Sequence, residues 1–179
     1  MAVLIPGKLI LLANPRTASV TATHYFMRYK GSIHIKKHHM PLLTVREEYK
    51  KQIKGKEIVA ANVRNPWDVM SSWWFNVERK GWEDFTKFVI LYNPSYIGPN
   101  LFIHPLIDLD FVIRFETLAK DIKRLTEMIG LTPQSITHEN KTKDKIPYRE
   151  LYAQFPGAKD AVYKRFRAII DRLGYTFDG

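Results

Sequence analysis

Two short apolar runs, each followed at once by a polar segment that can begin a helix, constrain the fold of this 179-residue chain most. Residues 8–13 (KLILLA) and 57–63 (EIVAANV) have the length and apolar content of buried strands. Residues 14–21 follow the first run, and residues 64–72 follow the second. A helix N-terminus offers free backbone N–H groups and a partial positive charge, and an arginine and hydroxyl residues lie beside each junction. Both junctions are therefore predicted to suit an anion.

The remaining sequence continues the alternation of strand and helix. Further strands are expected over residues 31–36 and 110–114, and helices over 19–28, 43–53, 66–78, 82–91, 118–129 and 158–173. This alternation predicts an α/β fold with a mainly parallel central sheet flanked by helices. A chain of this length is expected to form a single domain over residues 1–179. Residues 93–105, with three prolines and a glycine, are expected to form an irregular loop.

The charge balance favours a negatively charged partner. The chain has 28 basic and 18 acidic side chains, a formal net charge of +10, and no cysteine. Such a charge suits a nucleotide, a sulfated glycan, a nucleic acid or an anionic membrane, and charge alone does not choose among them. The lack of cysteine excludes disulfides, thiolate nucleophiles and cysteine-ligated zinc.

The apolar N-terminus is not expected to be a signal peptide. Pro6, Gly7 and Lys8 interrupt the run, no basic segment precedes it, and it leads straight into the first polar segment. No other stretch approaches the roughly 18 to 20 apolar residues of a membrane helix. The sequence therefore predicts a cytoplasmic protein without a membrane partner.

Four motifs, in this order, resemble those of sulfotransferases that use 3′-phosphoadenosine 5′-phosphosulfate (PAPS). Residues 15–19 (PRTAS) look like the family's 5′-phosphosulfate loop, with Ala18 where a glycine is usual. Residues 64–72 (RNPWDVMSS) reproduce the family's Arg-Asn-Pro-x-Asp-x-x-x-Ser segment for the 3′-phosphate. Residues 114–118 (RFETL) with Asp121 resemble a family stretch at a strand end, and residues 170–175 resemble its C-terminal ending.

The resemblance implies a P-loop-type, three-layer fold and transfer of a sulfuryl group from PAPS, leaving adenosine 3′,5′-bisphosphate. The acceptor would be a hydroxyl or amine of a small molecule or glycan. By resemblance, the residues that contact the cofactor are Arg16, Thr17, Ala18, Ser19, Val20, Thr21, Arg64 and Ser72. Asp68 is assigned a structural role, because a carboxylate repels phosphate unless it caps the helix or orients Arg64. No metal is expected, since the loop does not match the ATP-binding G-x-x-x-x-G-K-[ST] pattern.

A base within reach of the acceptor must remove its proton, and histidine suits this at neutral pH. Residues 36–41 (KKHHMP) resemble the family's Lys-Thr-His-Leu-Pro segment, which assigns the base to His39, with His38 second. Arg16 is the expected catalytic cation beside the leaving phosphate. Glu47 and Glu48 are reserve bases, since other branches of the family use a glutamate here.

Several alternatives stay open at this point. Residues 14–21 also fit an ordinary strand-to-helix turn with Ser19 as N-cap, and the histidines also fit a solvated basic loop. Lys36 and Lys37 are candidates for contact with the bridging oxygen or with an anionic acceptor. A lysine-rich segment near residue 143 resembles a lid over the 3′-phosphate, but a solvated loop fits it at least as well. That lid would contain Lys141, Lys143 and Lys145.

Other functions compete with sulfuryl transfer. The first rival is a non-catalytic protein that binds nucleotides or sulfated ligands, and the second is a basic nucleic-acid-binding domain, which ranks lower. The aromatic residues Trp67, Trp73, Trp74, Phe75 and Trp82 are expected to pack in the core rather than stack on a ligand. The aromatic content also leaves a homodimer open.

Overall fold

The computed structural model describes residues 2–35, 41–75, 82–92, 109–137 and 146–179. The chain divides into two compact units. Unit 1 takes its residues from Met1–Val63 and Ile97–Asn140, and unit 2 from Arg64–Tyr96 and Lys141–Gly179. The predicted α/β class is confirmed. A single domain over the whole chain stays a prediction.

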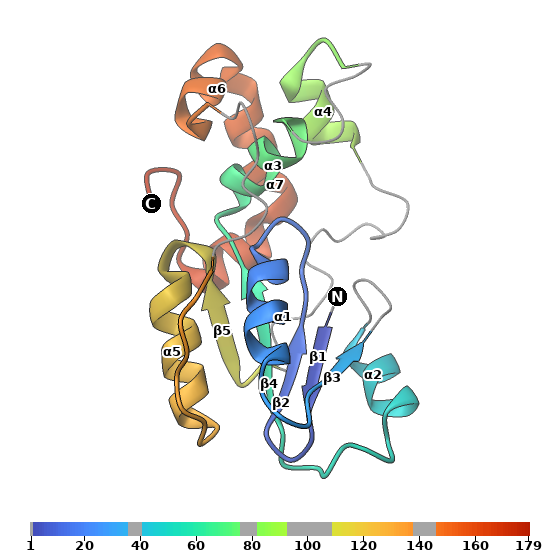
Figure 1. The fold of residues 1–179 in the computed structure, drawn as a ribbon. Coiled ribbons are helices and arrows are strands. Elements are labelled where there is room, and N and C mark those ends of the chain that lie inside the picture. Colours follow the sequence, from blue (N-terminus) through green and yellow to red (C-terminus); the bar gives the residue numbers. More distant parts are fainter. Residues whose placement is uncertain (1, 36–40, 76–81, 93–108, 138–145) are drawn as a thin grey trace. The chain divides into compact units, whose positions relative to one another are not determined.

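Unit 1 contains a mixed sheet of five strands in the described residues. The strands are β1 (Ala2–Ile5), β2 (Leu9–Leu12), β3 (Ile33–Ile35), β4 (Ile58–Val63) and β5 (Phe111–Arg114), in the order β3-β1-β2-β4-β5 (Figure 1). Strands β2, β4 and β5 are parallel, whereas β1 is antiparallel to both β2 and β3.

The expectation of a mainly parallel sheet therefore needs correction. Residues 2–5, to which the sequence analysis assigned no strand, form β1, and the chain turns back through Gly7 into β2. Gly7 has φ 72°, which the tight turn requires and which glycine adopts without steric cost. The backbone N–H of Lys8 closes the turn by donating to the carbonyl oxygen of Ile5 at 2.9 Å.

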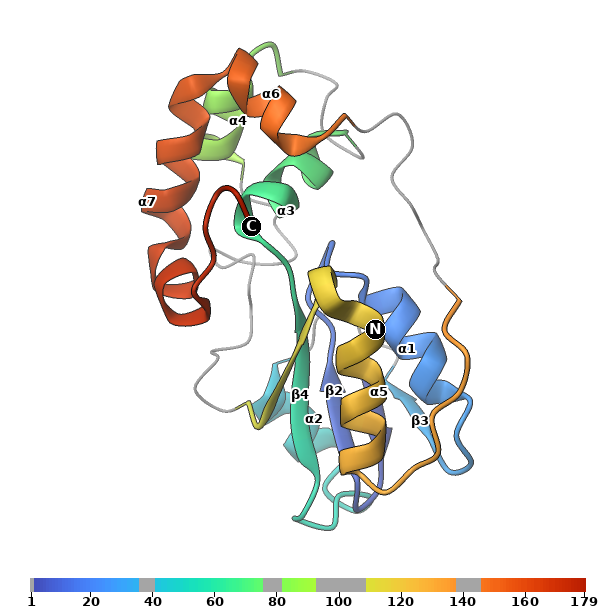
Figure 2. The same cartoon turned by 90° about the vertical axis from the view of Figure 1, so that its left-hand side faces the viewer.

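Both faces of the sheet are covered, which explains why its strands read as unbroken apolar runs. Helices α1 (Ser19–Met27) and α5 (Leu118–Met128) cover one face (Figure 2). Helix α2 (Leu42–Glu48) packs on the other face and ends earlier than the predicted residue 53. Because side chains alternate along a strand, Leu11 faces α1 and α5 whereas Leu12 faces α2.

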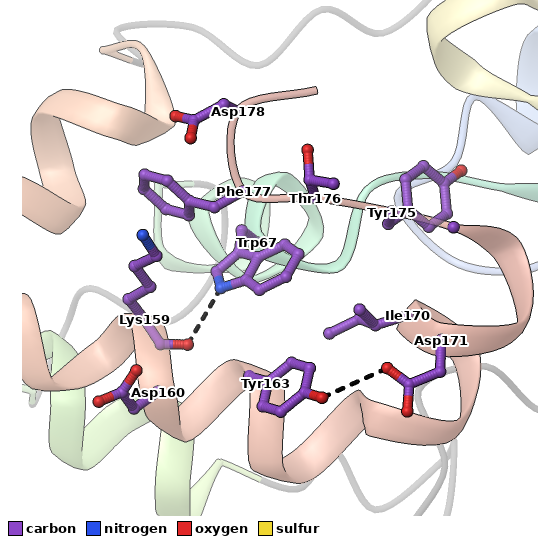
Figure 3. Close-up of a pocket in the computed structure, with 11 residues that line it drawn as sticks. Trp67, Lys159, Asp160, Tyr163, Ile170, Asp171, Tyr175, Thr176, Phe177 and Asp178 are labelled. Carbon is purple, nitrogen blue, oxygen red and sulfur yellow. Dashed lines mark hydrogen bonds between the residues drawn. The ribbon is translucent and has the colours of Figure 1, made fainter.

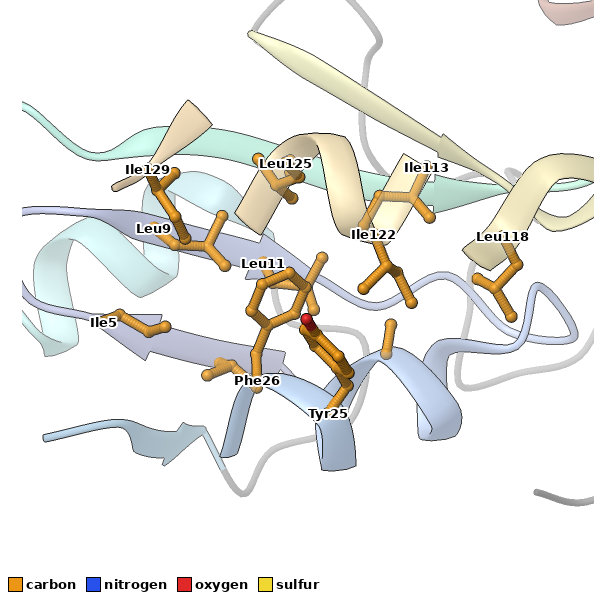
Figure 4. Packing of buried hydrophobic residues seen from close by; sticks show 13 residues of the cluster. Ile5, Leu9, Leu11, Tyr25, Phe26, Ile113, Leu118, Ile122, Leu125 and Ile129 are labelled. Atoms are coloured by element: carbon orange, nitrogen blue, oxygen red, sulfur yellow. The ribbon is translucent and has the colours of Figure 1, made fainter. Parts of the chain in front are cut away.

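The larger cluster lies under α1 and α5 (Figure 4). Phe26 of α1 and Leu9 of β2 are fully buried in it, and α5 contributes Ile122 and Leu125. Each such side chain contributes roughly 1.5 to 3 kcal/mol by leaving water, so this packing fixes α1 against the strands. A short 3-10 helix, Phe115–Thr117, joins β5 to α5.

Unit 2 is helical in its described residues. Its helices are α3 (Pro66–Trp73), α4 (Phe85–Leu91), α6 (Tyr148–Gln154) and α7 (Pro156–Leu173). Helix α7 packs against the other three, and α6 was not anticipated from the sequence. The predicted core role of the tryptophans is confirmed for Trp67, Trp73 and Trp74, which are buried.

No helix in the described part of the chain is long and apolar enough to cross a membrane.

Candidate anion-binding site

The loop between β2 and α1 has an unusual backbone conformation. Arg16 and Ala18 adopt left-handed conformations, with φ angles of 60° and 58°. The Thr17 hydroxyl donates to the carbonyl oxygen of Asn14 at 2.8 Å, and the Thr17 side chain is buried. Left-handed non-glycine residues are uncommon and cluster at functional sites, where the surrounding structure holds them in place. This loop therefore fits a ligand-binding role better than a simple connection.

The first turn of α1 lacks the side-chain cap that the alternative interpretation assumed. Ala18 occupies the N-cap position and its side chain has no hydrogen-bonding group, while Ser19 is the first helical residue. No acidic residue lies in the first turn. The open N–H groups and positive dipole end of a helix attract an anion, so this terminus is compatible with a phosphate or sulfate group.

Two buried asparagines lie where the parallel strands β2 and β4 end. The Asn14 side-chain amide donates to the carbonyl oxygen of Asn62 at 2.8 Å. Asn14 Oδ1 and both polar side-chain atoms of Asn62 are buried without a hydrogen-bond partner among the described residues. Asn62 was not among the predicted site residues. A single asparagine near the end of an apolar strand was the feature of the sequence that could have indicated it.

The second motif lies in unit 2, where Arg64 and Asp68 form an ion pair. Arg64 Nη2 lies 2.6 Å from Asp68 Oδ2, and Nε donates to the same oxygen at 2.7 Å. Asp68 therefore orients Arg64, one of the two structural roles predicted for it. The N-cap of α3 is Asn65, whose Oδ1 accepts from the backbone N–H of Trp67 at 3.1 Å. Ser72 is buried on the same helix.

The C-terminal segment of the chain packs against this motif. The Asn65 side chain donates to the carbonyl oxygen of Thr176 at 2.9 Å, and the Trp67 ring meets Phe177 edge to face. A cavity of about 550 Å³ lies beside these residues (Figure 3). Asp171 on its wall is hydrogen-bonded to Tyr163 at 3.4 Å. Residues of the C-terminal resemblance line the same cavity as Trp67, directly before the segment that contacts the second motif.

Several predicted site residues lie outside the described residues. These are the proposed bases His38 and His39 and the lysines Lys36, Lys37, Lys141, Lys143 and Lys145. The reserve bases Glu47 and Glu48 are exposed on α2, as expected of solvated glutamates.

Residues 114–121 connect β5 to α5, and Asp121 accepts two hydrogen bonds within this connection. The backbone N–H of Arg114 donates to Asp121 Oδ2 at 2.9 Å, and the Thr117 hydroxyl donates to the same oxygen at 2.7 Å. No group of three or more potential metal ligands occurs in the part of the chain that the structure describes.

Each of the two motifs, taken by itself, is compatible with an anionic group of a ligand. In unit 1, the β2–α1 loop and the start of α1 offer a helix N-terminus without a side-chain cap and buried threonine hydroxyls, and β4 offers the unsatisfied Asn62 amide. In unit 2, Arg64 offers a guanidinium already oriented by a carboxylate. Arginine binds phosphate through paired N–H groups, and such charge-assisted hydrogen bonds are stronger than neutral ones.

Comparison of the chain with protein-family models, with curated proteins and with solved structures finds no match.

Proposed function

We propose that this protein is a PAPS-dependent sulfotransferase that transfers a sulfuryl group in line to a hydroxyl or amine acceptor. The observation that carries the proposal is the β2–α1 loop, whose two left-handed residues lead into a helix without a side-chain N-cap. The full Arg-Asn-Pro-x-Asp-x-x-x-Ser pattern at residues 64–72 is the second support. The sheet, with α1 and α5 on one face and α2 on the other, is proposed as a reduced P-loop-type core.

In this proposal the β2–α1 loop stabilises negative charge. PAPS carries a sulfuryl group bonded to its 5′-phosphate, so transfer leaves a phosphate with additional negative charge. The N–H groups of residues 17–21 and the guanidinium of Arg16 are proposed to bind that phosphate. Positioning and charge neutralisation do most of the work in the related phosphoryl transfers.

The remaining roles divide between the two motifs and the histidine segment. Arg64 and Ser72 are proposed to bind the 3′-phosphate, with Asp68 holding Arg64 in place. His39 is proposed to take the proton of the acceptor, with His38 as the alternative base. Together with the absence of cysteine, this chemistry suits a cytoplasmic enzyme.

The test is a calorimetric titration with adenosine 3′,5′-bisphosphate, AMP and ATP on the wild type, Arg64→Ala and Arg64→Lys. We expect the wild type to prefer the bisphosphate. We expect Arg64→Ala to lose about tenfold or more in affinity for it, because a charge-assisted hydrogen bond is lost. Arg64→Lys keeps a positive charge beside Asp68, so it avoids the unfolding that an unpaired Asp68 would cause. It lacks the forked N–H donors of the guanidinium, which are the groups proposed to bind the phosphate.

Arg167→Ala is the matched control. Arg167 also pairs with an aspartate four residues later, at 3.3 Å from Asp171, but both side chains are exposed. We expect this variant to bind the bisphosphate like the wild type. Equal or absent binding of all three nucleotides by the wild type would contradict the proposal. Tight binding without turnover of PAPS would instead favour the non-catalytic binder.

A further inference from the structure

Asn62 is a polar residue in a position that the fold would fill with an apolar one. It is fully buried near the end of β4, directly after Ala60 and Ala61. Its partner in the parallel register with β5 is Ile113, which belongs to the cluster under α1 and α5. Strand alternation therefore places the Asn62 side chain on the face that α1 covers.

The unsatisfied state of this side chain lowers the stability of the ligand-free protein. Neither Nδ2 nor Oδ1 of Asn62 has a hydrogen-bond partner among the described residues. Nearly all buried polar groups in folded proteins are hydrogen-bonded, because leaving one unpaired forfeits its hydration without compensation. A leucine of similar size would avoid that penalty, so packing alone does not account for an asparagine here.

The position of Asn62 links it to the β2–α1 loop. Strands β2 and β4 are parallel neighbours, so their carboxyl-terminal ends lie at the same end of the sheet. The loop that leads into α1 follows β2 at that end. Asn14, two residues after the end of β2, donates from its side chain to the carbonyl oxygen of Asn62. The Asn14 side-chain oxygen is itself buried and without a partner in the described part of the chain. The two asparagines are thus joined through the Asn62 carbonyl oxygen, and each has buried side-chain atoms without a partner among the described residues.

We propose that Asn62 is a ligand-binding residue of the β2–α1 loop site. Its amide nitrogen donates to an oxygen of a bound phosphate or sulfate ester. The oxygens of Asn62 and Asn14 accept from a hydroxyl or water that accompanies the ligand. The identity of the ligand as a nucleotide rests on the proposed function, whereas the need for a hydrogen-bonding ligand rests on the buried amide alone.

The experiment compares Asn62→Leu and Asn62→Ala with Thr23→Val. Thr23 is the matched control because its hydroxyl is also buried without a partner in the described residues, but it lies in the second turn of α1. Stability is measured by urea denaturation, and affinity by calorimetric titration with adenosine 3′,5′-bisphosphate and with inorganic pyrophosphate. Asn62→Ala also removes the amide, so affinity can still be tested if a leucine side chain does not fit at this buried position.

We expect Asn62→Leu and Thr23→Val both to raise the urea midpoint, because each removes an unsatisfied buried group. We expect only the Asn62 variants to lose affinity, by about tenfold for one hydrogen bond to a charged ligand. A residue with a purely structural role would not show stability and affinity changing in opposite directions.

The outcomes separate this inference from the proposed function. Wild-type affinity in both Asn62 variants would overturn the inference and leave the sulfotransferase proposal standing. A lower urea midpoint in both Asn62 variants with unchanged affinity would likewise overturn it, since Asn62 would then serve packing and not binding. Loss of pyrophosphate binding in the Asn62 variants, without any preference of the wild type for a 3′-phosphate, would support the inference and contradict the proposed function.

Discussion

Ala18 is held in a backbone conformation that disfavours residues with a Cβ atom. Its φ of 58° lies in the left-handed region, where an ordinary L-residue is less stable than glycine by roughly 1 to 2 kcal/mol. The loop nevertheless keeps this geometry, and Arg16 two residues earlier has the same sign of φ. Strain of this kind persists where neighbouring contacts determine the backbone conformation. Here the buried Thr17, which lies between Arg16 and Ala18, is held by its hydrogen bond to the carbonyl oxygen of Asn14.

Replacing Ala18 with glycine is expected to stabilise the protein by up to about 1 kcal/mol. The relief of left-handed strain exceeds the added flexibility of glycine in the unfolded chain. Urea denaturation at pH 7 measures the change. Ala18→Val supplies the opposite case, because a β-branched residue fits poorly at positive φ and should destabilise the fold. An Ala18→Gly variant less stable than the wild type would show that the loop leaves this conformation in solution.

At this scale the sequence allowed part of the site to be predicted. Ala18 stands where the family usually has a glycine, and the structure shows a positive φ at this position, a conformation that glycine adopts most easily. For Asp68 the conflict between a carboxylate and a phosphate left two roles open, capping the helix or orienting Arg64, and the structure shows the second. The unsatisfied Asn62 amide did not follow, because hydrogen-bond satisfaction depends on tertiary neighbours that a strand pattern does not specify.

Among the elements, the β1–β2 hairpin shows why sheet topology was harder to predict than element type. Strands β2 and β4 match the two apolar runs of the sequence closely. Residues 2–5 are buried on both faces, so they lack the alternation that marks a half-exposed strand. The Pro-Gly-Lys turn is also not one of the strongest hairpin signals, such as Asn-Gly. Strand β1 and its antiparallel pairings therefore went unpredicted, although a strand was expected over residues 31–36, which contain β3.

The turn of this hairpin is tied to the segment before β4 by Glu57. Its Oε1 accepts from the backbone N–H of Gly7 at 2.7 Å and from that of Lys54 at 2.6 Å. Burial raises the pKa of Glu57, but hydrogen bonds from backbone N–H groups outweigh it and lower the pKa below the ordinary 4.5. The ionised carboxylate therefore stabilises the folded state.

Glu57→Gln is expected to lower stability at pH 7, and the difference from the wild type should shrink in acid. A lowered folded-state pKa contributes stability above the unfolded value, and that contribution is lost as pH falls through the folded-state pKa. Urea denaturation between pH 7 and about pH 3 follows the difference across the range in which carboxylates titrate. Glu127→Gln, at an exposed glutamate 3.9 Å from Lys123, is the control. If the wild type were more stable than Glu57→Gln by the same amount at every pH, the effect of Glu57 would come from the shape of its side chain and not from its charge.

For the whole molecule, the net charge of +10 predicts weak binding to any polyanion. Affinity for double-stranded DNA is expected to fall steeply between about 50 mM and about 200 mM salt, because bound counterions are released. Affinity for adenosine 3′,5′-bisphosphate should fall less, since fewer charges are neutralised. Fluorescence competition between labelled DNA and the bisphosphate at both salt concentrations measures this. If DNA remained the tighter ligand at the higher salt, the nucleic-acid-binding rival would take precedence.

The chain order of unit 1 has a consequence for its biosynthesis. The stretch Arg64–Tyr96 belongs to unit 2 and is made between β4 and β5 of unit 1. On the ribosome, β4 therefore emerges with one edge unpaired and with part of its α1-facing side chains uncovered until β5 and α5 follow. An open strand edge is a template for incorrect pairing, so we expect the nascent chain to be most prone to aggregation during that interval.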